Sequence, residues 1–166
     1  KFVDVDTLAA AMSRAAQRTS VPVALHLDHG HTYEGVMRAV RWGFTSVMFD
    51  GSALSVAENL KKTKEITRIA HSLGISVEGE LGYIGHCDDI TGVTSNEPVS
   101  AEVAMDFVTK TKIDALAVAV GTNHGAFKGT GGLNIARLAE LSQAVEVPLV
   151  LHGGSKLSRE DCRLVI

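Results

Sequence analysis

The chain has 166 residues, 45% of them hydrophobic and 21% charged, which is enough for one domain with a substantial core. Sixteen lysine and arginine residues against 19 aspartate and glutamate residues give a net charge of −3, which argues against a basic nucleic-acid-binding surface and an extreme acidic tail. No apolar run approaches the ~20 residues of a membrane span, and two cysteines form no disulfide framework, so we expect a cytoplasmic protein without nucleic-acid or membrane partners.

Short apolar runs alternate with helical patterns along the whole chain. After a helix over residues 6–19, strands are predicted at 21–26, 44–49, 75–80, 115–120 and 147–151. Helices are predicted after these strands, at 32–42, 55–73, 100–112, 134–144 and from 158 onward. Each strand is a nearly continuous apolar run, as in a parallel sheet buried on both faces. The alternation predicts an α/β fold, either a doubly wound sheet or part of a (β/α)8 TIM barrel, which needs about 250 residues.

Histidines, acids and glycines gather where the predicted strands end. The five ends read, in chain order, His26-Leu27-Asp28-His29-Gly30-His31, Phe49-Asp50-Gly51-Ser52, Glu78-Gly79-Glu80, Gly121-Thr122-Asn123-His124-Gly125 and His152-Gly153-Gly154-Ser155. The carboxyl ends of parallel strands meet at one edge of the sheet, and both candidate architectures place function there.

Three of these histidines predict a metal site. His29, His124 and His152 each precede a glycine and come from three different strand ends. Three imidazoles with one open position are a catalytic zinc geometry. Any one of them alone would be read as a hydrogen-bonded histidine of a cleft or core, so the prediction depends on their convergence.

Asp28, beside His29, is either an orienting partner of a metal ligand or a general base. Adjacent residues of a regular strand point to opposite faces, so we expect Asp28 and His29 to diverge, which favours the base. His26 is interpreted as a core or cleft histidine, whereas His31 and His71 lie in helical stretches and are expected to be solvated.

Two glycine-containing loops, residues 121–128 and 153–156, follow consecutive strands and each contains a lysine. Exposed backbone N–H groups in such loops suit phosphate oxygens, so a phosphorylated ligand is predicted. The segment 86–89 contains two acids in a glycine-flanked stretch, where an acid could close over a substrate.

These segments resemble, in order and over essentially the whole chain, the class II, zinc-dependent ketose-bisphosphate aldolases, the group of the fructose- and tagatose-bisphosphate aldolases. The matching motifs are Val21-Pro22-Val23-Ala24-Leu25-His26-Leu27-Asp28-His29-Gly30, Ser46-Val47-Met48-Phe49-Asp50-Gly51-Ser52, Ser76-Val77-Glu78-Gly79-Glu80-Leu81-Gly82, Gly121-Thr122-Asn123-His124-Gly125-Ala126-Phe127-Lys128 and Pro148-Leu149-Val150-Leu151-His152-Gly153-Gly154-Ser155.

The resemblance implies a (β/α)8 barrel in which the five strands are the third to seventh. Residues 1–166 are then a single domain, the central part of the barrel, without its first two strands and its last. The implied zinc ligands are His29, His124 and His152. Asp50 and Glu80 are implied at an alternative or second metal position. The implied phosphate and monovalent-cation (Na⁺ or K⁺) region contains Gly125, Lys128, Gly153, Gly154 and Ser155.

The resemblance also implies an activity, the reversible cleavage of a fructose or tagatose 1,6-bisphosphate to dihydroxyacetone phosphate and glyceraldehyde 3-phosphate. Zinc would polarise the carbonyl, Asp28 would act as general acid/base, and a loop acid would protonate the carbanion. The loop departs from the family pattern, which leaves that acid open between Asp88 and Asp89. A homodimer or homotetramer is implied as well.

Two alternatives remain open at this point. One is a catalytically inactive, metal-binding α/β fragment. The other is a Schiff-base aldolase using Lys128 or Lys156, which is disfavoured because a nucleophilic lysine needs a desolvated position and both follow glycines in loops.

Overall fold

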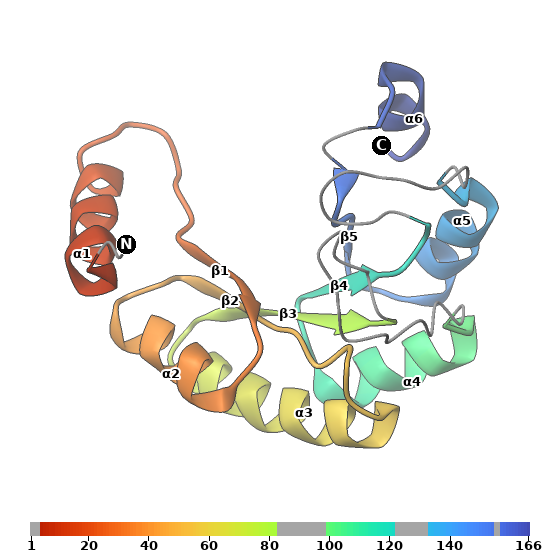
Figure 1. The fold of residues 1–166 in the computed structure, drawn as a ribbon, viewed down its shortest axis with the longest axis horizontal. Coiled ribbons are helices and arrows are strands. Elements are labelled where there is room, and N and C mark those ends of the chain that lie inside the picture. The colour runs from red at the N-terminus through yellow and green to blue at the C-terminus, as the bar shows by residue number, and fades with distance from the viewer. Residues whose placement is uncertain (1–3, 83–98, 122–132, 155–156) are drawn as a thin grey trace.

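The computed structural model of the chain describes residues 4–82, 99–121, 133–154 and 157–166. The described elements alternate between helix and strand throughout (Figure 1). They are α1 (Val5–Ala16), β1 (His26–Gly30), α2 (Tyr33–Arg41), β2 (Ser46–Phe49), α3 (Val56–Ser72), β3 (Ser76–Leu81), α4 (Ala101–Thr111), β4 (Ala115–Val118), α5 (Ile135–Ala144), β5 (Leu149–Val150) and α6 (Arg159–Leu164).

The strands form one five-stranded parallel sheet in the order β1-β2-β3-β4-β5. The predicted α/β fold with a parallel sheet is therefore confirmed. A doubly wound sheet reverses its strand order at a switch point, whereas the described strands follow one another without reversal. Helices α2 to α5 lie along one side of the curved sheet in Figure 1, an arrangement consistent with part of a (β/α)8 barrel.

Local capping signals explain where the helices begin. The Ser55 side chain accepts a hydrogen bond from Glu58 N at the start of α3, and Ser100 accepts one from Val103 N at the start of α4. Each bond satisfies an N–H group that has no partner within the helix, which stabilises a helix by about 1 kcal/mol.

The hydrophobic core lies between the sheet and its helices. Phe49, Ile66, Phe107 and Leu116 are among its fully buried members. Strand β3 shows how the two faces differ, because a Cβ on Gly79 would come within 3.2 Å of Phe107 and Ile113 on the helix side. Side chains alternate along a strand, so Glu78 and Glu80 point to the opposite face.

Strand β1 begins at His26, five residues after the predicted start at residue 21. Val21 and Val23 are 61% and 47% exposed, and the strand pairing to β2 starts at His26, just after the Leu25 carbonyl, which accepts from Thr45 N and Ser46 N. The apolar run before Leu25 therefore belongs to the connection from α1. Strand β5 is also shorter than predicted, with two residues.

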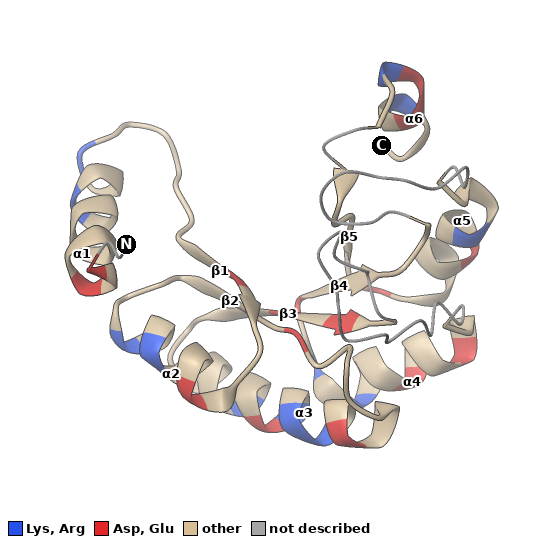
Figure 2. Ribbon diagram, viewed as in Figure 1, with Lys and Arg blue, Asp and Glu red and all other residues tan. Residues whose placement is uncertain are grey.

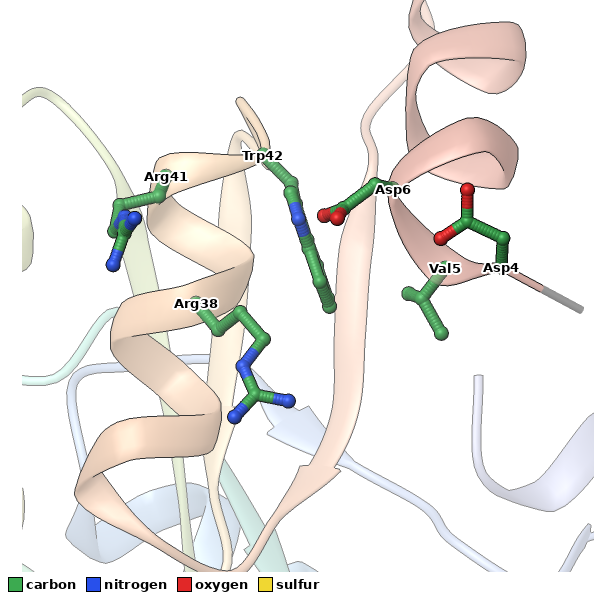
Figure 3. A pocket seen from close by; sticks show the side chains of 6 residues that line it. All are labelled: Asp4, Val5, Asp6, Arg38, Arg41 and Trp42. Carbon is green, nitrogen blue, oxygen red and sulfur yellow. The ribbon is translucent and has the colours of Figure 1, made fainter. Parts of the chain in front are cut away.

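Helix α1 lies away from the sheet, joined to it by residues 17–25 (Figure 1). A cavity of about 640 Å³ separates its first turn from the last turn of α2, and Figure 3 shows Asp6 facing Trp42 across it. Because α2 starts directly after β1 and Trp42 follows its last residue, this cavity is at the end of α2 remote from the strand ends.

The strands and the helices differ in charge. Figure 2 shows acidic and basic residues intermixed along α2 and α3. The described strands contain Asp28, Glu78 and Glu80 but no lysine or arginine. None of the helices in the described part of the chain combines the length and hydrophobicity that a bilayer crossing requires.

Candidate metal centre

A bulge near the end of β1 determines where Asp28 and His29 point. Leu27 pairs with Val47 and Gly30 pairs with Phe49, so β1 holds one residue more than β2 over this stretch. His29, in the bulge, has a left-handed backbone conformation with φ of 50°. Gly30 then passes so close to β2 that a Cβ there would lie 2.7 Å from the Met48 carbonyl oxygen.

Because of this bulge, Asp28 and His29 do not diverge, and the expectation from strand alternation is wrong. Asp28 Oδ1 lies 3.6 Å from His29 Nε2 and 3.9 Å from His152 Nδ1. The rings of His29 and His152 lie 4.6 Å apart at an angle of 66°. One ligand atom from each of these three residues falls within 4.8 Å of the others, so they form a possible metal site.

Asp50 and Glu80 complete a second, more deeply buried group with His29. His29 Nδ1 lies 2.9 Å from Asp50 Oδ2 and 3.7 Å from Glu80 Oε2. Asp50 is held in turn by Ser52, whose backbone N and hydroxyl both donate to Oδ1. The structure thus brings together Asp50 and Glu80, the two acids expected at a second metal position. His29 belongs both to this group and to the group with Asp28 and His152.

Glu78 joins the site although the sequence interpretation assigned it no role. Its Oε1 lies 2.7 Å from His152 Nε2, within hydrogen-bond distance. A sequence signal for it existed, because Glu78 and Glu80 are two residues apart on β3 and must share a face.

The electrostatics of the site favour positive charge. The hydrogen bond to Glu78 raises the pKa of His152 above its usual value, and the negative charges of Glu78, Glu80 and Asp28 add to this effect against the opposing effect of burial. Burial acts to raise the pKa of Asp50, but hydrogen bonds from Ser52 and His29 outweigh it and keep this pKa below its usual value. A cation at the centre would experience the same negative field.

The other histidines have distinct surroundings. His31 is 63% exposed, as expected for a solvated side chain, yet its Nδ1 lies 3.4 Å from Asp50 Oδ2. His71 is also partly exposed and pairs with Asp114 at 2.8 Å. His26 hydrogen-bonds Ser46 Oγ at 2.9 Å.

Several of the predicted site residues are not among those that the structure describes. Of the predicted phosphate-binding residues, Gly153 and Gly154 are described. They come directly after His152, and Gly153 has a φ of 69°. The predicted residues outside the described ranges are His124, Asp88, Asp89, Gly125, Lys128, Lys156 and Ser155.

The described donor set fits a zinc ion. Imidazole nitrogen and carboxylate oxygen are both zinc ligands. Histidine ligands characteristically donate a hydrogen bond from their second ring nitrogen to a carboxylate, which fixes the orientation of the ring. His29 does this with Asp50, and His152 does it with Glu78.

The chain is similar to known proteins along its whole length. The family profile "Fructose-bisphosphate aldolase class-II" matches residues 1–166. A fructose-bisphosphate aldolase of Thermus caldophilus is 44% identical over 149 residues, which are 87% of this chain and 49% of that protein. A sulfofructosephosphate aldolase of Alkalicoccus urumqiensis is 40% identical over 166 residues, covering 99% of this chain and 58% of that protein.

The fold comparison gives the same answer. The crystal structure of the YdjI aldolase from Escherichia coli K12 superimposes with a TM-score of 0.86 at 36% identity, covering 98% of this chain and 57% of that chain. The chain thus spans about half the length of the relatives it matches. On its sequence, its fold and the whole-length family match, the chain belongs to the class II fructose-bisphosphate aldolase family.

Proposed function

We propose that this chain carries the metal and acid–base centre of a zinc-dependent aldolase that cleaves a ketose 1,6-bisphosphate. The products would be dihydroxyacetone phosphate and glyceraldehyde 3-phosphate. The observation that carries the proposal is the position of Asp28, an exposed carboxylate within 4 Å of ring nitrogens of both His29 and His152. Residues 1–166 would be the central part of a (β/α)8 barrel that assembles as a homodimer or homotetramer.

His29 and His152 would hold the zinc ion with His124, which lies outside the described residues. A bound zinc ion would supply Lewis-acid polarisation of the substrate carbonyl. Asp50 and Glu80 would provide a second cation position, supported by their burial next to His29 Nδ1.

Asp28 is suited to act as the general acid/base. Its side chain is 68% exposed, so a substrate hydroxyl can reach it, and its carboxylate lies beside the imidazoles of both His29 and His152. In the cleavage direction Asp28 takes the C4 hydroxyl proton, that oxygen becomes the aldehyde oxygen, and the C3–C4 electron pair stays with the dihydroxyacetone phosphate half. A loop acid, Asp88 or Asp89, would then return a proton to C3.

The phosphate groups would be bound by the backbone after β5. Gly153 and Gly154 lie at the carboxyl end of the sheet, and a Cβ on Gly154 would have no neighbour closer than 3.6 Å. Exposed N–H groups at such a position suit phosphate oxygens. Gly125, Lys128 and Ser155 would complete the phosphate and monovalent-cation region.

The replacement Asp28→Asn in the full-length protein tests the acid/base role. We expect zinc content to stay at the wild-type level while kcat for cleavage of fructose and tagatose 1,6-bisphosphates falls about 10²–10⁴-fold, the usual contribution of a general base. Asp106→Asn, an exposed carboxylate paired with Lys110 on α4, is the matched control and should leave kcat unchanged. A wild-type kcat in Asp28→Asn would contradict the proposal.

A further inference from the structure

Glu78 is a carboxylate that the sheet buries directly beside the candidate metal centre. Its side chain is 9% exposed, and Glu78 Oε1 lies 2.7 Å from His152 Nε2. A buried carboxylate is costly unless it is paired and hydrogen-bonded. The contact with His152 satisfies this requirement and ties β3 to the segment that follows β5.

This contact determines which nitrogen of His152 faces the centre. With Nε2 at Glu78, Nδ1 lies on the side of Asp28, 3.9 Å from Oδ1. A neutral imidazole has one N–H and one lone pair on its two nitrogens. When Nε2–H donates to Glu78, the lone pair is on Nδ1, the nitrogen that a cation shared with His29 would need.

A second histidine lies beside the other carboxylate oxygen of Glu78. Glu78 Oε2 lies 3.6 Å from His26 Nε2, and His26 Nδ1 lies 2.9 Å from Ser46 Oγ. Both carboxylate oxygens of Glu78 therefore face an imidazole, so rotation of the carboxylate would break one contact or the other. The row Ser46, His26, Glu78, His152 crosses from β2 and β1 through β3 to the end of β5.

We propose that Glu78 is a positioning residue that sets the tautomer and the ring orientation of His152 for metal binding. The proposal rests on the proposed function, because it takes zinc to be the ion bound at this centre. The two histidines are held by opposite ring nitrogens. Asp50 contacts Nδ1 of His29, which leaves Nε2 of His29 facing Asp28. Glu78 contacts Nε2 of His152, which leaves Nδ1 of His152 facing Asp28.

The test compares zinc affinity in the full-length protein and its Glu78→Gln, Glu78→Ala and Glu146→Gln variants. Each is stripped of metal and titrated with zinc against a chelating dye. Replacement of such an outer carboxylate typically weakens metal binding 10–100-fold. We expect a loss of about 10-fold for Glu78→Gln, which keeps the shape, and about 100-fold for Glu78→Ala. Glu146 is exposed, so Glu146→Gln removes the same charge and should keep the wild-type affinity.

A second measurement does not depend on metal. Nitrogen-15 NMR of labelled histidine in the metal-free protein should show His152 protonated at Nε2 in its neutral form, and a mixture of tautomers in Glu78→Ala. A purely structural role would lower thermal stability but leave both zinc affinity and tautomer unchanged, and that outcome would overturn the proposal. Wild-type protein that binds no zinc would instead refute the proposed function, and this role with it.

Discussion

Glu80, the most deeply buried acid of the site, is kept in place through its backbone as well as through its side chain. Asn59 Nδ2 on α3 donates to the Glu80 carbonyl oxygen at 2.8 Å, and Thr63 Oγ1 donates to Asn59 Oδ1 at 2.9 Å. Gly51, which follows Asp50, packs against the same amide, and a Cβ there would overlap Asn59 Oδ1. A single glycine therefore leaves room for the contact between α3 and β3.

Gly51→Ala is expected to lower the free energy of unfolding by about 1–3 kcal/mol, the usual cost of forcing an extra carbon into a packed interior. Urea denaturation measures this change. In the double variant Gly51→Ala/Asn59→Ala, the amide that the new Cβ would displace is absent. The loss of unfolding free energy in the double variant should therefore be smaller than the sum of the losses in the two single variants. An unfolding free energy for Gly51→Ala equal to that of wild type would show that Asn59 moves aside at no cost.

At the scale of an element, helix α4 ends on an unfavourable residue. Lys112, its C-cap, has φ of 60° in the left-handed region, and its N–H donates to Val108 O. A residue with a Cβ loses about 1–2 kcal/mol in this conformation, whereas glycine adopts it freely and is the usual residue at such helix ends.

Lys112→Gly should therefore raise the free energy of unfolding by about 1 kcal/mol, because relief of the strain exceeds the added flexibility of the unfolded chain. Lys112→Ala is the matched control: it removes the same charge and keeps the Cβ, so it should bring no such gain. Thermal and urea unfolding of the three proteins provide the comparison. An equal gain in both variants would assign the effect to the lysine charge instead of the backbone.

At the scale of the whole molecule, the candidate site connects the two outer strands of the described sheet. His29 comes from β1 and His152 from the end of β5, which are separated in the sheet by β2, β3 and β4. Curvature of the sheet nevertheless brings their rings to 4.6 Å. An ion bound by both residues would act as a cross-link between distant parts of the chain.

Zinc should consequently stabilise the fold as a whole. A ligand that binds the native state only, present at about 100 times its Kd, adds about 2.7 kcal/mol, so chelation should lower Tm clearly. His152→Ala should abolish the zinc-dependent shift in Tm. His71→Ala removes a histidine that pairs with Asp114 away from the centre, so it should lower the basal Tm and keep the shift. A shift that persists in His152→Ala would exclude this residue as a ligand.

The order of the elements, the parallel sheet and the edge at which polar residues gather could all be predicted from the sequence. These properties follow from local signals: continuous apolar runs, helix caps such as Ser55 and Ser100, and glycines after the strands. Period-two alternation on β3 also suffices to place Glu78 on the face of Glu80, although its partner was not evident from the sequence.

Which of these side chains come into contact depends on how the strands pair and curve. Strand alternation predicted that Asp28 and His29 diverge, and a bulge against β2 turns both toward His152. The start of β1 at His26 likewise depends on where β2 pairs, which the hydrophobicity of residues 21–25 does not reveal. The contact of Glu78 with His152 joins residues 74 positions apart. Pairing register and sheet curvature arise from contacts between strands, so no single segment of the sequence encodes them.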